Sequence, residues 1–251
     1  MHFRLDGRAA FVSGAAGHLG RAMTWALAEA GAHVVINGRD DSRLKDFEGE
    51  LKSAGHSAER AAFDVTDFDA VRKFFAGRDR LDIIVNNAVS MTPAPFDALD
   101  ASAFGLTYKS SVTAAFEIVR AARPLLKAGG QGSVINIASM YGLVSPDPRI
   151  YADPGQASPF HYGPAKAALI QLTRHLAAGL GPDNIRVNAL VPGPFPKAAA
   201  PEFAEKLASR TMLGRTGKAS EIAGPLLFLA STASSYVTGT ALIVDGGWTA
   251  W

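Results

Sequence analysis

The sequence predicts a doubly wound α/β fold, in which helices cover both faces of a parallel sheet. Short apolar runs rich in β-branched residues alternate with longer helical patterns along the chain, and such alternation is typical of this fold class. A glycine-rich turn follows the first apolar run, at the place where doubly wound sheets bind nucleotides. No linker rich in Pro, Ser or charge interrupts the pattern, so we expect a single domain over residues 1–251.

The elements follow from this alternation. Strands are expected at Ala9–Ser13, Ala32–Asn37, Ala58–Phe63, Leu81–Asn86, Ser133–Ser139, Ile185–Val191 and Ala241–Val244. The intervening segments are long enough for crossover helices, with helical patterns at Leu19–Ala30, Asp41–Ala54, Phe104–Lys127, His161–Leu180 and Ser220–Ala230, and a further helix near Pro201–Ser209.

Composition favours small-molecule chemistry. The chain has 25 basic and 23 acidic residues, a net charge of +2, and no basic cluster interleaved with aromatics, which argues against nucleic acid or anionic membrane as a partner. The absence of cysteine excludes disulfides, thiolate metal sites and thiol nucleophiles. Without a signal-like N-terminus or a spanning apolar run, we expect a cytoplasmic protein. We also expect no metal site.

The first expected strand leads into a turn containing Gly14, Gly17 and Gly20. Glycine allows the backbone to approach a pyrophosphate closely, and the following helix N-terminus stabilises the negative charge. We therefore expect a dinucleotide at Gly14, Gly17, His18, Leu19 and Gly20. The alternative is an ordinary strand-to-helix turn.

The second strand ends in Asn37 and Gly38, followed by Arg39. An acid at this place favours NAD, whereas a guanidinium favours the 2′-phosphate of NADP. Asn37 and Arg39 are therefore expected to bind NADP(H) in preference to NAD(H). NAD(H) stays possible, because Asp40 and Asp41 follow at once and could pair with Arg39 on the surface.

A catalytic group is predicted at the start of the helix near His161. Tyr162 and Lys166 lie one helical turn apart, and a fixed ammonium favours the phenolate and so lowers the pKa of the phenol. Ser139, at the end of a buried strand, could hold the reacting oxygen. The alternative is a chance Tyr/Lys pair on a solvated helix, but no other tyrosine has a lysine at the fourth following position.

Together with Asp64-Val65, Asn86-Asn87-Ala88 and Pro192-Gly193, these motifs resemble the short-chain dehydrogenases/reductases over essentially the whole chain. The resemblance implies a Rossmann-type sheet of seven strands and hydride transfer between a nicotinamide and a carbonyl or alcohol carbon. It implies that Tyr162 exchanges the proton, Ser139 holds the oxygen and Lys166 binds the ribose. It adds cofactor contacts at Asp64, Val65, Asn87, Ala88, Tyr162, Lys166, Pro192 and Gly193, although Asp64 could instead cap the following helix.

Three residues depart from the family pattern. His18 stands where the family has its middle glycine, and Val89 replaces a glycine. Ser111 stands at the position of the asparagine that completes the catalytic group, where the family uses the backbone carbonyl to hold a water leading to the lysine. We expect Ser111 to keep that carbonyl and the activity to survive.

Two irregular segments are expected to contact the substrate. The connection from Ser139 to Tyr162 is longer than in the family and rich in Pro and polar groups, including Asp147, Asp153 and Gln156, and such loops are usually functional or disordered. The candidate substrate residues are Tyr141, Arg149, Tyr151, Phe195 and Lys197. The alternatives are a surface excursion for the connection and solvated surface cations for Arg149 and Lys197.

The sequence thus predicts an NADP(H)-dependent oxidoreductase acting on a secondary alcohol or ketone, with a polyol, sugar or sugar acid as the favoured substrate class. A 3-oxoacyl thioester reductase and a dinucleotide-binding sensor with little turnover are the alternatives. In the family, helices corresponding to Phe104–Lys127 and His161–Leu180 pair across a two-fold axis, so a homodimer or homotetramer is expected. Trp248 and Trp251 could pack at a subunit interface.

Overall fold

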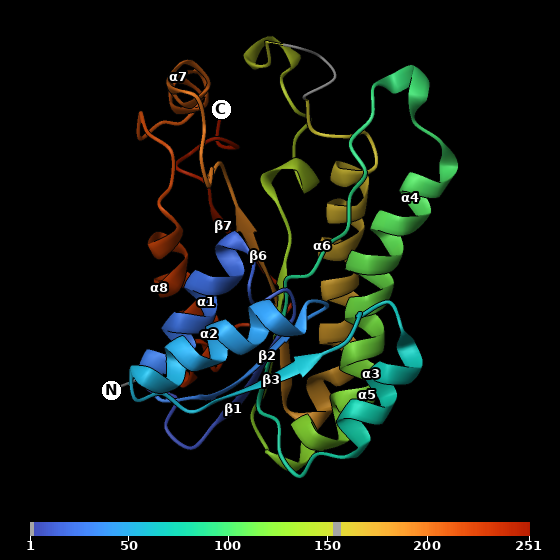
Figure 1. Ribbon diagram of the computed structural model, residues 1–251, viewed down its shortest axis with the longest axis vertical. Coiled ribbons are helices and arrows are strands. Elements are labelled where there is room, and N and C mark those ends of the chain that lie inside the picture. The colour runs from blue at the N-terminus through green and yellow to red at the C-terminus, as the bar shows by residue number, and fades with distance from the viewer. Residues whose placement is uncertain (1–2, 153–156) are drawn as a thin grey trace.

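The computed structural model describes residues 3–152 and 157–251, which form a parallel sheet of seven strands between two layers of helices (Figure 1). The strand order is β3-β2-β1-β4-β5-β6-β7. The strands are β1 (Ala9–Val12), β2 (His33–Gly38), β3 (Ala58–Ala62), β4 (Ile83–Asn86), β5 (Gly132–Ile137), β6 (Ile185–Pro192) and β7 (Ala241–Val244). Every strand expected from the apolar runs is confirmed.

The helices cover both faces of the sheet, as the fold class requires. They are α1 (His18–Glu29), α2 (Asp41–Ser53), α3 (Phe68–Ala76), α4 (Ala101–Tyr108), α5 (Ala114–Ala128), α6 (Tyr162–Leu180), α7 (Pro201–Ser209) and α8 (Ala223–Ala230). In Figure 1, α1, α2 and α8 lie on one side of the sheet and α3, α4, α5 and α6 on the other. The short helix α3 is an addition to the helices named from the sequence.

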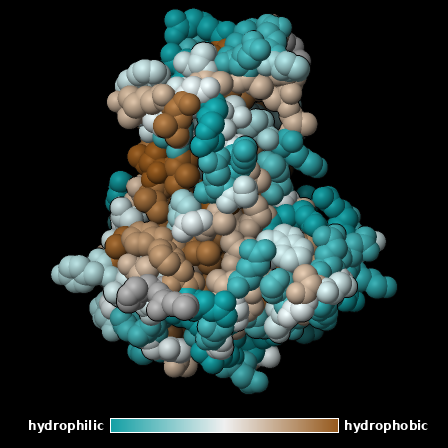
Figure 2. Space-filling view, turned by 90° about the vertical axis from the view of Figure 1, so that its left-hand side faces the viewer, coloured by the Kyte–Doolittle hydropathy of each residue, from teal (hydrophilic) through white to brown (hydrophobic). Residues whose placement is uncertain are grey.

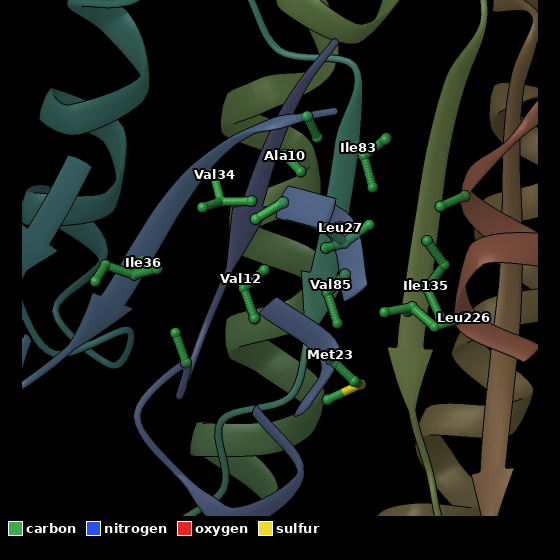
Figure 3. Close-up of a cluster of buried hydrophobic side chains, with 14 of the residues drawn as sticks. Ala10, Val12, Met23, Leu27, Val34, Ile36, Ile83, Val85, Ile135 and Leu226 are labelled. Atoms are coloured by element: carbon green, nitrogen blue, oxygen red, sulfur yellow. The ribbon is translucent and has the colours of Figure 1, made fainter. Parts of the chain in front are cut away.

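Two apolar clusters hold these layers to the sheet. On the α1 and α8 side, Met23, Leu27 and Leu226 pack against buried strand residues, and Figure 3 shows them around Val12, Val85 and Ile135. On the other face, α3, α5 and α6 cover a second cluster that contains Phe11, Phe75 and Ile118. Because both faces are covered, the strands are apolar along most of their length rather than alternating.

The expected helix Phe104–Lys127 is wrong in its continuity and its start. It begins at Ala101, because the Asp100 carboxylate caps it by accepting from the Ser102 amide at 2.7 Å. It is then divided by a π-helical turn over Lys109–Thr113. The hydroxyls of Ser110 and Ser111 donate to the Thr107 carbonyl at 3.3 Å and 2.6 Å, and this competition with the backbone accompanies the wider turn.

The C-terminal tryptophans have different environments. Trp248 is 4% exposed and packs within the chain against Met140, Ile150 and Leu207, so its expected place at a subunit interface is wrong. Trp251 is 71% exposed, and its indole donates to the Arg210 carbonyl. Its expected role stays a prediction.

One side of the molecule presents apolar surface next to an uncovered edge of the sheet. Figure 2 shows hydrophobic residues gathered on the side that carries α1 and α8. A shallow groove lined by Phe3, Ala26, Ala223 and Leu227 lies between the N-terminal segment, α1 and α8, and β7 is one of the two edge strands. Among the described residues, no helix has the length and apolar character needed to cross a membrane.

Candidate active site

A cavity of about 460 Å³ lies at the carboxyl ends of the strands, on both sides of the point where the strand order reverses between β1 and β4. This is where doubly wound sheets bind ligands. Most of the predicted cofactor residues line it: Gly14, Gly17, His18, Leu19, Gly20, Asn37, Arg39, Asp64, Val65, Asn87, Ala88, Tyr162, Lys166 and Pro192. Gly193 does not line it, and its amide donates to the Val244 carbonyl at 2.9 Å.

The glycine turn is held open by its close approach to the segment after β4. Gly14 has φ +63°, and a Cβ there would lie 2.9 Å from Asn87 Nδ2 and 3.2 Å from Ala88 Cα, so only glycine fits this backbone without strain. Asn87 Nδ2 donates to the carbonyls of Ser13 and Gly14 at 3.1 Å. The turn therefore leaves room for a pyrophosphate at the N-terminus of α1, which begins at His18.

Arg39 points along the cavity rather than toward its sequence neighbours. Its Nη1 lies 3.9 Å from Asp64 Oδ2 and its side chain is 71% exposed. Asp40 caps α2 by accepting from the Arg43 amide, and Asp41 pairs with Arg60 at 2.8 Å. Both aspartates therefore have other partners. The expected alternative, a surface pairing of Arg39 with Asp40 and Asp41, is not observed.

Two other predicted cofactor residues, Asn37 and Asp64, make hydrogen bonds within the chain at the edge of the cavity. The Asn37 amide donates to the carbonyls of Ala61 and Phe63 at 2.8 Å and 3.1 Å, which ties β2 to the end of β3. Asp64 accepts from the Thr66 amide at 2.8 Å. The cap of α3 is Asp67, so the alternative reading of Asp64 as that helix cap is wrong.

Tyr162 and Lys166 lie at one end of the cavity, with Ser139 beside Tyr162 but outside the cavity lining. Tyr162 and Lys166 line it, Lys166 Nζ lies 5.6 Å from the centre of the Tyr162 ring, and the Ser139 side chain makes a hydrogen bond to Tyr162. Lys166 is 3% exposed and donates to the Ile137 carbonyl at 2.7 Å. Strand β5 and the first turn of α6 therefore bring the three groups together.

Burial sets the charge states of this group. It raises the pKa of the Tyr162 phenol, an effect that the hydrogen bond with Ser139 partly offsets, and it lowers the pKa of Lys166 to about 8. The net shift of the Tyr162 pKa is upward and Lys166 is not among its causes, so the expectation that Lys166 lowers this pKa stays a prediction. The ammonium lies over the ring and is directed at a backbone carbonyl.

Ser111 is buried beside this site without lining the cavity. Its hydroxyl is occupied by the Thr107 carbonyl, so its side chain is not free to reach a ligand. Ser110, which directly precedes Ser111, lines the cavity together with Ser90. The Ser90 amide donates to Ser110 Oγ at 2.9 Å.

The candidate substrate residues divide into two groups. The hydroxyls of Tyr141 and Tyr151 are 2.8 Å apart, and the Tyr151 ring packs on Phe203 of α7 with centroids 5.6 Å apart. Burial, followed by the bond with Tyr151, raises the pKa of Tyr141, and the proximity of Tyr162 contributes. The long connection and α7 are thereby joined beside Tyr162. Asp153 and Gln156 lie outside the described residues.

None of these five candidates lines the cavity that holds Tyr162, and the second group also lies apart from the Tyr141–Tyr151 pair. Arg149 is 82% exposed and pairs with Asp147 at 2.8 Å, and this pairing lowers the pKa of Asp147 to about 2. Lys197 is exposed. Phe195 lines a separate cavity of about 80 Å³ with Leu213 and Gly217. The structure therefore brings Tyr141 and Tyr151, but not Arg149, Lys197 and Phe195, into one cluster near Tyr162.

Some cavity residues were not predicted from the sequence: Ala16, Gly38, Asp40, Arg43, Leu44, Phe63, Val89, Ser90, Ser110, Ile137 and Ala138. Arg43 is the most informative of them, because it adds a second guanidinium beside Arg39. It lies in the first turn of α2, whose N-cap, Asp40, directly follows Arg39. This closeness in sequence was the available signal.

Comparison with known proteins is consistent with this geometry. A family model described as enoyl-(acyl carrier protein) reductase matches residues 14–249. The chain is 34% identical to gluconate 5-dehydrogenase of Gluconobacter oxydans, with 98% of this chain and 96% of that protein covered. It is 31% identical to a 3-oxoacyl-[acyl-carrier-protein] reductase of Thermotoga maritima, with 97% and 98% covered.

A solved structure is also similar to this chain over its whole length. The crystal structure of a gluconate 5-dehydrogenase from Burkholderia cenocepacia in complex with NADP and tartrate superimposes with a TM-score of 0.89 and 32% sequence identity. The match covers 100% of this chain and 98% of that one.

Proposed function

The chain belongs to the short-chain dehydrogenase/reductase family and is an oxidoreductase, and from this premise we propose that it transfers a hydride between NADP(H) and a secondary alcohol or ketone of a small hydroxylated compound. The observation that carries the proposal is the position of Tyr162, with Ser139 beside it, and Lys166 at one end of a cavity whose other parts suit a dinucleotide. The nicotinamide supplies the hydride when it is bound.

The protein groups supply orientation and the proton. In the reducing direction the Tyr162 hydroxyl donates its proton to the carbonyl oxygen, and Ser139 donates a hydrogen bond to the same oxygen. Burial keeps Tyr162 protonated near neutral pH, which suits a proton donor. As the proton leaves, the buried ammonium of Lys166 stabilises the phenolate, because the low local dielectric strengthens attraction between the two charges.

NADP(H) is the proposed cofactor. Arg39 and Arg43 both line the cavity beyond the end of β2, and β2 itself ends in Asn37 and Gly38 rather than in the acidic residue that favours NAD(H). The relative solved with NADP lends support. Fluorescence titration of the protein with NADPH and NADH tests this choice. We expect NADPH to bind more tightly, and tighter binding of NADH would contradict it.

A polyol, sugar or sugar acid is the proposed substrate class. The paired phenols of Tyr141 and Tyr151 place two hydroxyl groups near Tyr162, which suits a substrate rich in hydrogen-bonding groups. Similarity to a gluconate 5-dehydrogenase points the same way. A panel of polyols, sugar acids and keto compounds, followed by nicotinamide absorbance, tests the class.

A 3-oxoacyl thioester reductase is the second candidate, favoured by the similarity to the Thermotoga maritima reductase. Turnover of acetoacetyl thioesters without turnover of any hydroxylated compound would establish it in place of the first. We further propose a cytoplasmic homodimer or homotetramer, since the chain lacks cysteine and exposes large apolar side chains on α4 and α5.

A further inference from the structure

The residue before Tyr162 is a buried histidine that contacts two other segments of the chain. His161 is 1% exposed. Its Nδ1 lies 2.9 Å from Thr107 Oγ1 in α4, and its Nε2 lies 3.2 Å from the carbonyl oxygen of Thr92, in the segment after β4. Phe104 packs edge-on against the imidazole with centroids 5.9 Å apart, which fixes the plane of the ring.

These contacts continue to the wall of the cavity. The Thr107 hydroxyl donates to the Ser90 carbonyl at 2.9 Å, and the Ser90 amide donates to Ser110 Oγ at 2.9 Å. Ser90 and Ser110 both line the cavity beside Tyr162. A continuous set of hydrogen bonds thus runs from the first residues of α6 to the wall that faces the reacting groups.

The chemistry of the partners requires a donor at this position. The carbonyls of Thr92 and Ser90 can only accept, so the contact with Thr92 needs a donor at Nε2 of the ring, and the contact with Ser90 needs the Thr107 hydroxyl as donor. A neutral imidazole carries one N–H and satisfies two of the three contacts, whereas an imidazolium satisfies all three. In either state the imidazole acts as a directional bridge, and an apolar side chain of similar size would leave buried polar groups unpaired.

We propose that His161 is a positioning residue, which holds the start of α6, and with it Tyr162, against the segment of Ser90–Thr92 and against α4. The hydroxyl of Tyr162 must meet the substrate oxygen within hydrogen-bond reach, and a displacement of about 1 Å can reduce turnover on the order of 100-fold. The effect on turnover rests on the function proposed above. The bridge itself is independent of it.

The two bridge contacts can be removed separately. His161→Asn places an amide near the position of Nδ1 and keeps a donor toward Thr107, whereas His161→Gln places one near Nε2 and keeps a donor toward Thr92. His161→Leu keeps neither. His56→Leu is the matched control, because His56 packs edge-on against Trp25, with centroids 5.5 Å apart, between α2 and β3 and does not line the cavity.

Hydrogen exchange followed by mass spectrometry tests the bridge without turnover. We expect amides of residues 88–92 to exchange at least about tenfold faster in His161→Leu and His161→Asn, and to stay protected in His161→Gln and in the control. If His161→Leu does not fold by circular dichroism, the contrast between the Asn and Gln variants decides. Identical exchange in both would overturn the bridge.

Kinetics on a substrate that the wild-type protein turns over test the positioning. We expect kcat of His161→Leu to fall about 10- to 100-fold, with smaller losses in the Asn and Gln variants and an NADPH Kd within about threefold of wild type. Unchanged kcat in a folded variant, or a loss that only follows the folded fraction, would overturn positioning. A wild-type protein without turnover of any substrate would instead count against the proposed function, while the exchange result would stand.

Discussion

The buried ammonium of Lys166 lowers the stability of the folded protein near neutral pH. Burial lowers its pKa from 10.5 to about 8, so between these values the unfolded chain binds more protons than the folded protein. Stability therefore rises with pH across this window. The full difference corresponds to about 3 kcal/mol.

This difference can be measured against a variant without the charge. We expect the free energy of unfolding of the wild type to increase relative to that of Lys166→Met as pH rises from 8 to 10.5, by up to about 3 kcal/mol. Urea unfolding of both proteins at pH 7 and pH 10 measures it, and the other titrating groups, which the two proteins share, largely cancel. A stability difference independent of pH would show that Lys166 is not desolvated as described.

Arg39 and Arg43 carry the proposed discrimination between cofactors. Loss of a charge-assisted hydrogen bond costs about 1.5–3 kcal/mol, so we expect Arg39→Gln and Arg43→Gln each to weaken NADPH binding at least about tenfold and to leave NADH binding nearly unchanged. Fluorescence titration measures both. Arg123→Gln is the control, because Arg123 lies on α5 and pairs with Asp183. Equal weakening of NADPH and NADH would argue against a 2′-phosphate contact.

At the scale of single residues, the sequence predicted that Ser139, Tyr162 and Lys166 lie together, but it did not predict the direction of the Tyr162 pKa shift. The spacing of Tyr162 and Lys166 and the position of Ser139 at a strand end were enough to place them together. The direction of the Tyr162 pKa depends on burial, which emerges only when the chain folds. His161 carried no signal either, because its partners Thr92 and Thr107 are distant in sequence.

At the scale of elements, the long connection between β5 and α6 is where substrate choice is expected to lie. Its Tyr151 reaches Tyr141 at 2.8 Å and packs on Phe203 of α7, so two separate segments share one wall. We expect Tyr151→Phe to raise KM about 3- to 10-fold, as loss of one hydrogen bond implies, with kcat nearly unchanged.

Steady-state kinetics on the preferred substrate of the panel check this. Tyr236→Phe is the control, because Tyr236 is fully exposed and lies outside the cluster that contains Tyr141, Tyr151 and Phe203. If Tyr151→Phe leaves KM unchanged, the phenol pair does not contact the substrate and the connection has another role.

The elements themselves were well predicted where periodicity was strong and less so where side chains intervene locally. Apolar runs located each strand, since buried parallel strands are apolar on both faces. The π-helical turn at Lys109–Thr113 was not visible, because the apolar pattern of a helix continues through it. The serine hydroxyls that bond to Thr107 were the available signal.

At the scale of the whole molecule, the exposed aromatics of α4 and α5 favour an assembly. Phe104, Tyr108 and Phe116 are 45%, 50% and 40% exposed, which is costly for a monomer. We expect a dimer or tetramer in sedimentation velocity at micromolar concentration, and a shift toward monomer in Phe104→Glu and Phe116→Glu. Tyr236 is an exposed aromatic outside these helices, so we expect the Tyr236→Glu variant to keep the assembly state of the wild type. A monomeric wild type would contradict the assembly.

The central claim is that Tyr162 exchanges a proton with the substrate beside a bound NADP(H), and one comparison tests it most directly. NADPH oxidation is measured for the wild type and Tyr162→Phe on the same keto substrate, with NADPH Kd measured in parallel. We predict a loss in kcat of about 10²- to 10⁴-fold, the usual contribution of general acid catalysis, with Kd unchanged within about threefold. Full turnover by Tyr162→Phe would contradict the account.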